Sequence, residues 1–222
     1  MRRVILNFHG IGTPKRPLEP DEDRYWVTPD FFQQTLKLAA QCSDLVETHV
    51  TFDDGNLSDL EIAAPLLAKQ GKSATFFVLS SRIGTEGSLS AAHLRELLAM
   101  GHKIGSHGAD HVDWRALDAK GRVREWETAR DAISDAAGII IDEAAIPFGR
   151  YRAPVLRGLK TRGYTRVYSS DGGDWKQGDT PIPRTSPRAD MTIADIENVL
   201  LGRDSFKTRT RRRLAMLAKR WT

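Results

Sequence analysis

Residues 51–56, with the sequence Thr-Phe-Asp-Asp-Gly-Asn, place two adjacent carboxylates at the end of an apolar run. The segment at 45–52 alternates in polarity and is rich in β-branched residues, which predicts a β-strand. The Asp-Gly pair then turns the chain, so Asp53 and Asp54 are expected at the C-terminal end of this strand. Parallel α/β folds carry their chemistry at that end. Taken alone, the segment is more typical of an ordinary turn with a solvated aspartate, and a functional interpretation needs a second group of residues.

The rest of the chain alternates between predicted strands and predicted helices. Further apolar or alternating runs predict strands at 4–8, 73–80, 102–106, 144–148 and 164–170. Thr28 and Ser58 are expected to cap helices, a further helix is expected to begin at Ser90, and two more helices are predicted at 118–137 and 155–162. This alternation is typical of parallel βαβ units. With 222 residues and 40% hydrophobic composition, the chain is expected to form one α/β domain, either a barrel or a doubly wound sheet.

Composition excludes several classes of protein and site. The single cysteine, Cys42, excludes an intrachain disulfide and a cysteine-rich metal site. The apolar run at 4–8 is too short for a signal peptide, and no later run has the length of a membrane span. We therefore expect a cytoplasmic protein.

The net charge of +4 is unevenly distributed along the chain. Residues 203–222 contain eight Lys or Arg against Asp204, which gives +7 and leaves −3 for residues 1–202. This contrast predicts a domain at 1–202 followed by a basic tail at 203–222.

The tail also has an apolar stripe at helical spacing, formed by Phe206, Leu214, Leu217 and Trp221. Such an amphipathic helix could dock on the domain, lie on an anionic membrane surface or contact nucleic acid. The simplest expectation is that the tail helix docks on the domain or exposes its charged face to solvent. Beyond that, we expect weak membrane or glycolipid association and no nucleic acid, because no aromatic-basic interleaving accompanies the charge.

Two histidines, His107 and His111, follow the predicted strand at 102–106. On one helical turn their spacing would place both imidazoles on the same face, where they could ligate a metal. Two histidines and one carboxylate leave coordination positions open, as in a catalytic zinc site. Asp54 is the natural third ligand, and Asp53 would then be free to act as a base. An isolated pair of histidines is a weak motif, but its coincidence with two aspartates at another strand end favours the metal site.

The two motifs together, at 51–55 and 106–111, resemble the polysaccharide deacetylase family, also called the NodB-homology domain or carbohydrate esterase family 4. The resemblance covers roughly residues 4–200. It implies a distorted (β/α) barrel of about seven strands that removes acetyl groups from N-acetylated sugars with a divalent metal, commonly zinc. It also implies that Asp53 is the catalytic base and that Asp54, His107 and His111 are the metal ligands.

Two later segments match the family pattern only in part. Ile146-Pro147-Phe148-Gly149 is similar to the family's Arg-Pro-Pro-Tyr-Gly segment, but Ala145 stands where the arginine is expected. Residues 171–175 are similar to its Asp-x-x-Asp-Trp segment, in which the aspartate corresponding to Asp174 usually pairs with that arginine and the tryptophan corresponding to Trp175 lines the groove. Phe148, Gly149, Arg150, Asp174 and Trp175 are therefore the expected substrate-binding residues. Arg150 and Arg152 are the sequence candidates for a partner of Asp174.

The proton donor is the largest departure from the family pattern. Many members carry a late histidine for this role, whereas this chain has no histidine after His111. His9 is the candidate, because it ends the first strand and the first and last strands of a barrel are neighbours. The alternative for His9 is a purely structural histidine in a strand-end turn.

The sequence thus predicts a metal-dependent deacetylase that acts on an N-acetylated sugar in a glycan or glycan precursor. A cytoplasmic location would suit surface-polysaccharide biosynthesis. The alternative is a glycan-binding or scaffolding protein that retains the barrel without activity, which the missing arginine and late histidine suggest. A third possibility, a metal hydrolase for another amide or ester, would share the same site.

Overall fold

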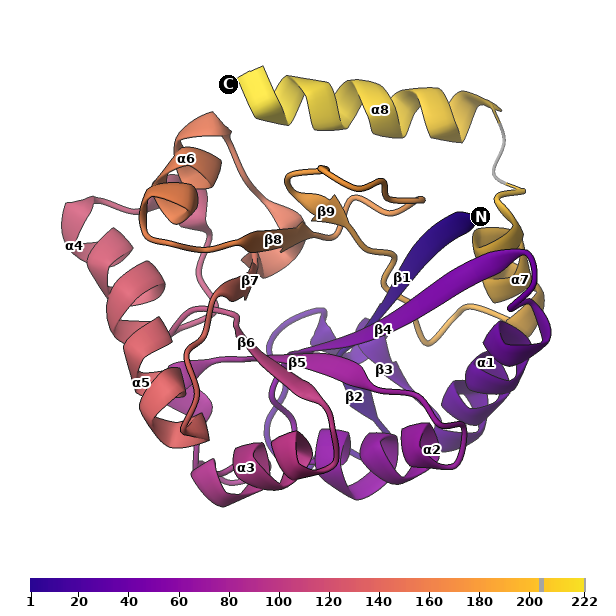
Figure 1. The fold of residues 1–222 in the computed structure, drawn as a ribbon, viewed down its shortest axis with the longest axis horizontal. Helices are drawn as coiled ribbons and strands as arrows, with labels where there is room; N and C mark the ends of the chain where they lie inside the picture. The colour runs from indigo at the N-terminus through magenta and orange to yellow at the C-terminus, as the bar shows by residue number, and fades with distance from the viewer. Residues whose placement is uncertain (204–205, 222) are drawn as a thin grey trace.

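The computed structural model describes residues 1–203 and 206–221 (Figure 1). Its main sheet has seven strands in the order β1-β4-β5-β6-β7-β8-β9, and all neighbouring pairs are parallel. These strands are β1 (Arg2–Phe8), β4 (Val46–Asp54), β5 (Ala74–Val78), β6 (Lys103–Ser106), β7 (Glu143–Ala145), β8 (Arg166–Ser169) and β9 (Ile182–Pro183). A separate two-stranded sheet pairs β2 (Gly10–Ile11) with β3 (Trp26–Val27).

The sheet curls into a nearly closed barrel. The residue that follows β9 by two positions, Thr185, donates its N–H to Ile5 O (2.9 Å) and accepts from Asn7 N–H (2.8 Å). The end of the last strand therefore meets the first strand, which brings residues from both ends of the chain to one point. The predicted distorted (β/α) barrel with about seven strands is confirmed.

Helices surround the barrel on its outside (Figure 1). They are α1 (Pro29–Gln41), α2 (Ala64–Ala68), α3 (Ala91–Ala99), α4 (Ala119–Val123), α5 (Ala129–Ala137), α6 (Ala153–Thr161), α7 (Ile193–Leu201) and α8 (Phe206–Trp221). Wide π turns at Asp59–Ala63 and Arg124–Thr128 lead into α2 and α5. The largest apolar cluster packs strand residues such as Leu6, Phe52 and Phe76 against helix residues such as Phe32 and Leu94. This packing stabilises the strand ends on which the site is built.

The predicted cap at Thr28 and the predicted helix start at Ser90 are both observed, and Ser90 also serves as a cap. Thr28 accepts from Phe31 N–H (3.1 Å) and Ser90 accepts from His93 N–H (3.2 Å), so both satisfy a helix N–H that would otherwise lack a partner. The prediction for Ser58 was wrong. Ser58 has helical backbone angles and its hydroxyl accepts from Ile11 N–H (3.2 Å), which ties β2 to the turn after β4.

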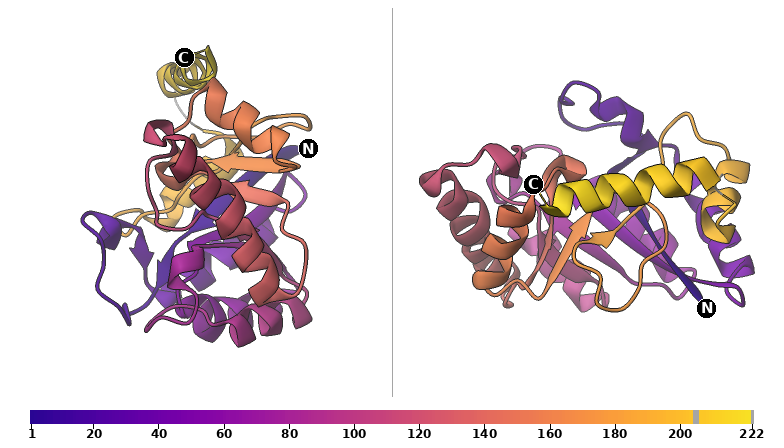
Figure 2. Two further views of the ribbon diagram at one scale, coloured as in Figure 1. Left: turned by 90° about the vertical axis from the view of Figure 1, so that its left-hand side faces the viewer. Right: turned by 90° about the horizontal axis from the view of Figure 1, so that it is seen from above.

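The C-terminal helix α8 lies across the outside of the barrel and contacts α6 (Figure 2). Lys219 on this helix donates to Asp171 Oδ1 (2.6 Å) and Gly149 O (3.1 Å). Leu214 and Leu217 face outward, with 61% and 49% of their surface exposed. The side chains of Phe206 and Trp221, the other members of the predicted stripe, lie outside the described part. Docking is thus observed, whereas the division into a domain at 1–202 and a tail at 203–222 stays a prediction.

None of the helices in the described residues combines the length and the apolar character that crossing a bilayer requires.

Candidate metal centre and active site

A pocket of about 330 Å³ opens at the carboxyl ends of the barrel strands. It contains the predicted metal ligands and catalytic residues together with part of the loop that precedes α1. Its lining includes His9, Glu19, Tyr25, Asp53, Asp54, His107, His111, Phe148, Arg150, Ser170 and Ser186. The structure therefore brings together residues that are up to 177 positions apart in the sequence.

Asp54 is the last residue of β4, where the strand conformation ends. Its φ of 78° is in the left-handed region, which aspartate tolerates better than most residues, and Gly55 follows at 70°. This turn explains how two consecutive carboxylates can both line one pocket, although consecutive strand residues normally face opposite sides. Both oxygens of Asp54 are buried and have no hydrogen-bond partner among the residues that the structure describes. A buried carboxylate in this state indicates a binding site for a cation.

His107 and His111 supply the nitrogen atoms nearest to Asp54. Their Nε2 atoms lie 3.6 Å and 3.8 Å from Asp54 Oδ1, and the three ligand atoms are all within 4.8 Å of one another. The other ring nitrogen of His107 donates to Ala145 O (2.9 Å), and that of His111 donates to Glu19 (2.8 Å). These bonds fix the tautomer that leaves each Nε2 free for a metal.

The helical turn predicted for His107 and His111 was wrong. The segment is an irregular loop in which Gly108 (φ 89°) and His111 (φ 54°) adopt left-handed angles. The buried Glu125 carboxylate holds this loop by accepting from the N–H groups of Ala109 (2.8 Å) and Asp110 (3.1 Å). A side chain at position 108 would clash with Glu125, because its Cβ would lie 2.3 Å from Oε2. The two imidazoles meet through loop geometry, with ring centroids 5.4 Å apart.

These residues fit a divalent metal. Two imidazole nitrogens and one carboxylate converge, and within the described part of the chain the carboxylate has no hydrogen-bond partner. Burial lowers the pKa of the His107 imidazole and outweighs the opposite effect of Asp53 and Asp54. His107 is therefore neutral at neutral pH, the form that ligates metals.

Asp53 is held by Arg184 in a buried bidentate ion pair. Arg184 Nη1 and Nη2 each lie 2.7 Å from a different oxygen of Asp53, and Asn7 Nδ2 donates to the same carboxylate (2.9 Å). Arg184 is fully buried. Burial alone would raise the pKa of Asp53, but the charge of Arg184, followed by that of His107, holds it well below its usual range. Asp53 is thus ionised and cannot be a solvated turn residue.

Arg184 is the functional residue that the sequence interpretation missed. It follows the two-residue strand β9, whose proline weakens the strand pattern. The signal that could have revealed it is an arginine at the end of a last strand, beside the first strand of a closed barrel. Arg184 is thus a buried arginine at the site, although Ala145 stands at the position where the family pattern has its arginine.

His9 lies at the carboxyl end of β1 and lines the same pocket. Its ring packs on Tyr25, with centroids 4.8 Å apart, and its buried Nδ1 has no hydrogen-bond partner among the described residues. The structure therefore places His9 in the same pocket as Asp53, Asp54, His107 and His111. Its role stays a prediction.

Phe148 and Arg150 form one wall of the pocket, and Gly149 lies between them in the chain. The Phe148 ring lies 4.3 Å from that of His111, and the Arg150 guanidinium lies 5.3 Å from the Phe148 ring. Phe148 and Gly149 both have positive φ (57° and 60°), and a Cβ at position 149 would lie only 2.8 Å from Ser170 N. Arg150 pairs with Asp113 (3.6 Å), so it is not the partner of Asp174.

Asp174 and Trp175 lie at the opposite end of the barrel from the pocket. Asp174 is 3.9 Å from Arg2, and Trp175 donates its N–H to Arg3 O (3.1 Å), both at the amino end of β1. The Trp175 ring contacts His49 in the first half of β4 and Arg166, the first residue of β8. The structure therefore does not bring these two expected substrate-binding residues to the site. Asp171, the first residue of the same segment, lies nearer to it and binds Lys219.

Lys219 is expected to support the pocket wall through Gly149 and Asp171. The Asp171 carboxylate is 4% exposed and also accepts from the hydroxyls of Tyr151 and Ser169. Lys219→Met removes the cationic partner, so we expect a loss of about 1–3 kcal/mol in the free energy of unfolding. Urea denaturation measures this loss. Arg211→Met on the exposed face of α8 is the matched control, with an expected change within about 0.5 kcal/mol. Equal stability of the two variants would contradict the docking contact.

Comparisons with known proteins identify the family of this chain. The family model for polysaccharide deacetylases matches residues 46–167. YxkH of Bacillus subtilis is 27% identical over 185 residues, which cover 76% of this chain and 64% of that protein. The chitooligosaccharide deacetylase of Rhizobium leguminosarum bv. trifolii is 30% identical over 137 residues, covering 61% of this chain and 62% of that protein. The chain thus spans less than two thirds of the length of these relatives.

Solved structures share the fold. The deacetylase PplD of Streptococcus pyogenes, solved in complex with acetate, superposes with a TM-score of 0.75 at 19% identity, covering 90% of this chain and 98% of that one. IcaB from Ammonifex degensii superposes with a TM-score of 0.72 at 20% identity, covering 91% and 97%. The family match covers more than half of the chain and includes Asp53, Asp54, His107 and His111. This chain belongs to the polysaccharide deacetylase family.

Proposed function

We propose that this protein is a metal-dependent deacetylase that hydrolyses the acetamide of an N-acetylated sugar in a glycan or glycan precursor. The observation that carries the proposal is the Asp54, His107 and His111 cluster beside the ionised Asp53 in one pocket. This donor set suits zinc, because nitrogen ligands with one carboxylate leave positions open for chemistry. When bound, such a cation acts as a Lewis acid that lowers the pKa of water and polarises a carbonyl group.

Asp53 is the proposed base. Its carboxylate is ionised and lies 3.9 Å from His107 Nε2, so it borders the position that the three ligand atoms surround. It accepts a proton from the attacking water while the new oxygen–carbon bond forms. Arg184 keeps the carboxylate oriented because both guanidinium nitrogens are bonded to it.

His9 is the proposed proton donor. The carbon–nitrogen bond of the acetamide breaks as the nitrogen receives a proton, and the products are acetate and the free amine. His9 enters the pocket from β1, and its buried Nδ1 has no hydrogen-bond partner within the described residues. A backbone N–H is also proposed to stabilise the developing oxyanion. The Gly149 N–H already donates to Ile146 O (3.0 Å), so we assign this role to the neighbouring Phe148 N–H.

The names of the relatives support a sugar substrate. One relative is described as a chitooligosaccharide deacetylase and another as a chitin deacetylase. On that basis, we propose oligomers of N-acetylglucosamine as test substrates. We also propose a cytoplasmic role in polysaccharide synthesis. Weak membrane association of the tail is also retained as a proposal, with Leu214 and Leu217 as its exposed apolar contacts. Against the inactive scaffolding alternative, we propose that Arg184, which binds Asp53, and His9, which lines the pocket, take the roles of the missing motif arginine and late histidine.

Acetate release tests the proposed function. The zinc-loaded protein is expected to release acetate from N-acetylglucosamine oligomers, and a chelator is expected to abolish this activity until zinc is restored. The Asp54→Ala variant serves as the metal-site control and should be inactive in both conditions. Zinc-loaded protein that releases no acetate from these oligomers, although it binds zinc, would favour the other amide or ester substrates.

A further inference from the structure

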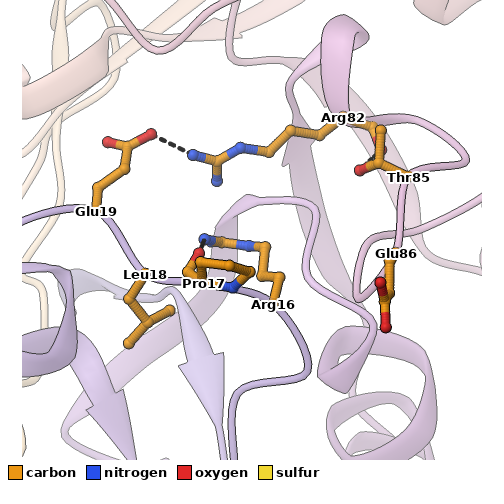
Figure 3. A pocket seen from close by; sticks show the side chains of 7 residues that line it. All are labelled: Arg16, Pro17, Leu18, Glu19, Arg82, Thr85 and Glu86. Atoms are coloured by element: carbon orange, nitrogen blue, oxygen red, sulfur yellow. Dashed lines mark hydrogen bonds and ion pairs between the residues drawn. The ribbon is translucent and has the colours of Figure 1, made fainter.

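The loop between β2 and α1 reaches over to the second metal-ligating histidine. Glu19 in this loop accepts from His111 Nδ1 with its Oε2 atom (2.8 Å). Its other oxygen, Oε1, pairs with the Arg82 guanidinium, which extends toward it from the turn after β5 (Figure 3). One carboxylate therefore links His111 to an arginine on a different element.

Glu19 is held in place by a buried ion pair within its own loop. Arg16 and Glu22 pair with only 8% and 7% of their side chains exposed, and Glu22 accepts from the Glu19 N–H (2.8 Å). Arg16 Nε also donates to Asn56 Oδ1 (2.9 Å), two residues after Asp54. The loop that carries Glu19 is thus anchored to the turn that carries the carboxylate ligand.

The two histidines differ in what supports them. The Nδ1 of His107 donates to a neutral carbonyl, Ala145 O, within the barrel. The Nδ1 of His111 donates to a carboxylate, and His111 sits at a φ of 54° in an irregular loop. A left-handed residue in a loop depends on its surroundings for its conformation. A carboxylate partner on the second ring nitrogen also raises the basicity of the ligating nitrogen.

We propose that Glu19 is a positioning residue that orients His111 for metal binding and that Arg82 holds Glu19 in this position. The inference rests on the proposed metal-dependent function. Residue 19 lies before the segment 46–167 matched by the family model, so the part of the chain outside that match contributes to the metal centre. Glu19 lines both the metal pocket and a neighbouring groove of about 500 Å³, which is also lined by Arg16, Arg82, Thr85 and Glu86.

Zinc affinity, measured by competition with a chromogenic chelator, tests this role. Glu19→Ala is expected to weaken zinc binding about 10–100-fold, because outer partners of metal ligands have effects of this size. Glu19→Gln keeps an oxygen acceptor without the charge and should fall between the wild type and Glu19→Ala. Arg82→Met should also weaken binding, by less than Glu19→Ala, since Glu19 itself remains.

Glu86→Ala is the matched control, because Glu86 is an exposed acidic residue in the neighbouring groove and should leave zinc affinity unchanged. Wild-type affinity in Glu19→Ala, with the wild type binding one zinc, would overturn the inference alone. A wild type that binds no zinc, or an Asp54→Ala variant that binds it equally well, would overturn the proposed metal centre and the inference with it. The Glu19→Gln and Arg82→Met variants keep the test decisive if Glu19→Ala does not fold.

Discussion

Replacing Asp53 with Asn is expected to lower kcat by about 10²- to 10⁴-fold while one zinc stays bound, the range that loss of a general base produces. The amide has nearly the same shape but cannot accept the proton from water. Asp54, His107 and His111, the three residues that converge on the metal position, are unchanged. Acetate release gives the rate, and the zinc content of the purified variant gives the occupancy.

His107→Ala is the matched comparison for Asp53→Asn. It removes a ligand nitrogen 3.6 Å from Asp54, so zinc and turnover should be lost together. The assignment of separate roles to the two adjacent aspartates would be contradicted by full zinc occupancy in His107→Ala. It would also be contradicted by kcat within about tenfold of the wild type in Asp53→Asn.

Replacing Arg184 with Met is expected to destabilise the folded protein by about 3–5 kcal/mol at pH 7, the cost of leaving one member of a buried ion pair without its partner. Asp53 is 2% exposed, and two of its hydrogen bonds come from Arg184. Asn7 alone cannot compensate a buried negative charge. Urea denaturation of both proteins at pH 7 measures the difference.

The pH dependence of this difference follows from the pKa of Asp53. That pKa is lowered in the folded protein from the ordinary value of 3.8, so the stabilising contribution is present above pH 3.8 and disappears as the pH falls through the folded-state pKa. The gap between the wild type and Arg184→Met should therefore narrow below pH 3.8. Urea midpoints at pH 7 and at about pH 3 test this sign.

Arg188→Met provides the control for the loss of an arginine near the same strand. Arg188 pairs with Asp190 at 3.0 Å, but the two side chains are 43% and 72% exposed, so their ion pair contributes little. We expect a change within about 0.5 kcal/mol. An Arg184→Met variant as stable as Arg188→Met would show that the buried pair does not hold Asp53.

Sequence patterns predicted an α/β domain and the strand end that carries the two aspartates, and the family resemblance predicted the barrel. Alternating strand and helix patterns predicted five of the strands besides β4, and the carboxylates at its end lie where expected. These predictions succeeded because they depend on local patterns, namely side-chain periodicity and helix caps. The short strands β2, β3 and β9 were missed, since two residues carry no periodicity.

The supporting residues of the site could not be predicted in the same way. Arg184 reaches Asp53 across 131 positions, and Glu19 reaches His111 across 92. Such pairs arise from barrel closure and loop packing, which leave no local pattern in the sequence. Trp175 illustrates the converse: its segment resembles a groove motif, yet the chain after β8 carries it to the amino ends of the strands.

Anomalous diffraction from a zinc-soaked crystal tests the central claim most directly. We predict one strong peak about 2.0–2.2 Å from an Asp54 carboxylate oxygen and the Nε2 atoms of His107 and His111, with Asp53 beside it but not ligating. A zinc-soaked crystal without a peak between these three residues, or with zinc held by Asp53 in place of Asp54, would contradict the account.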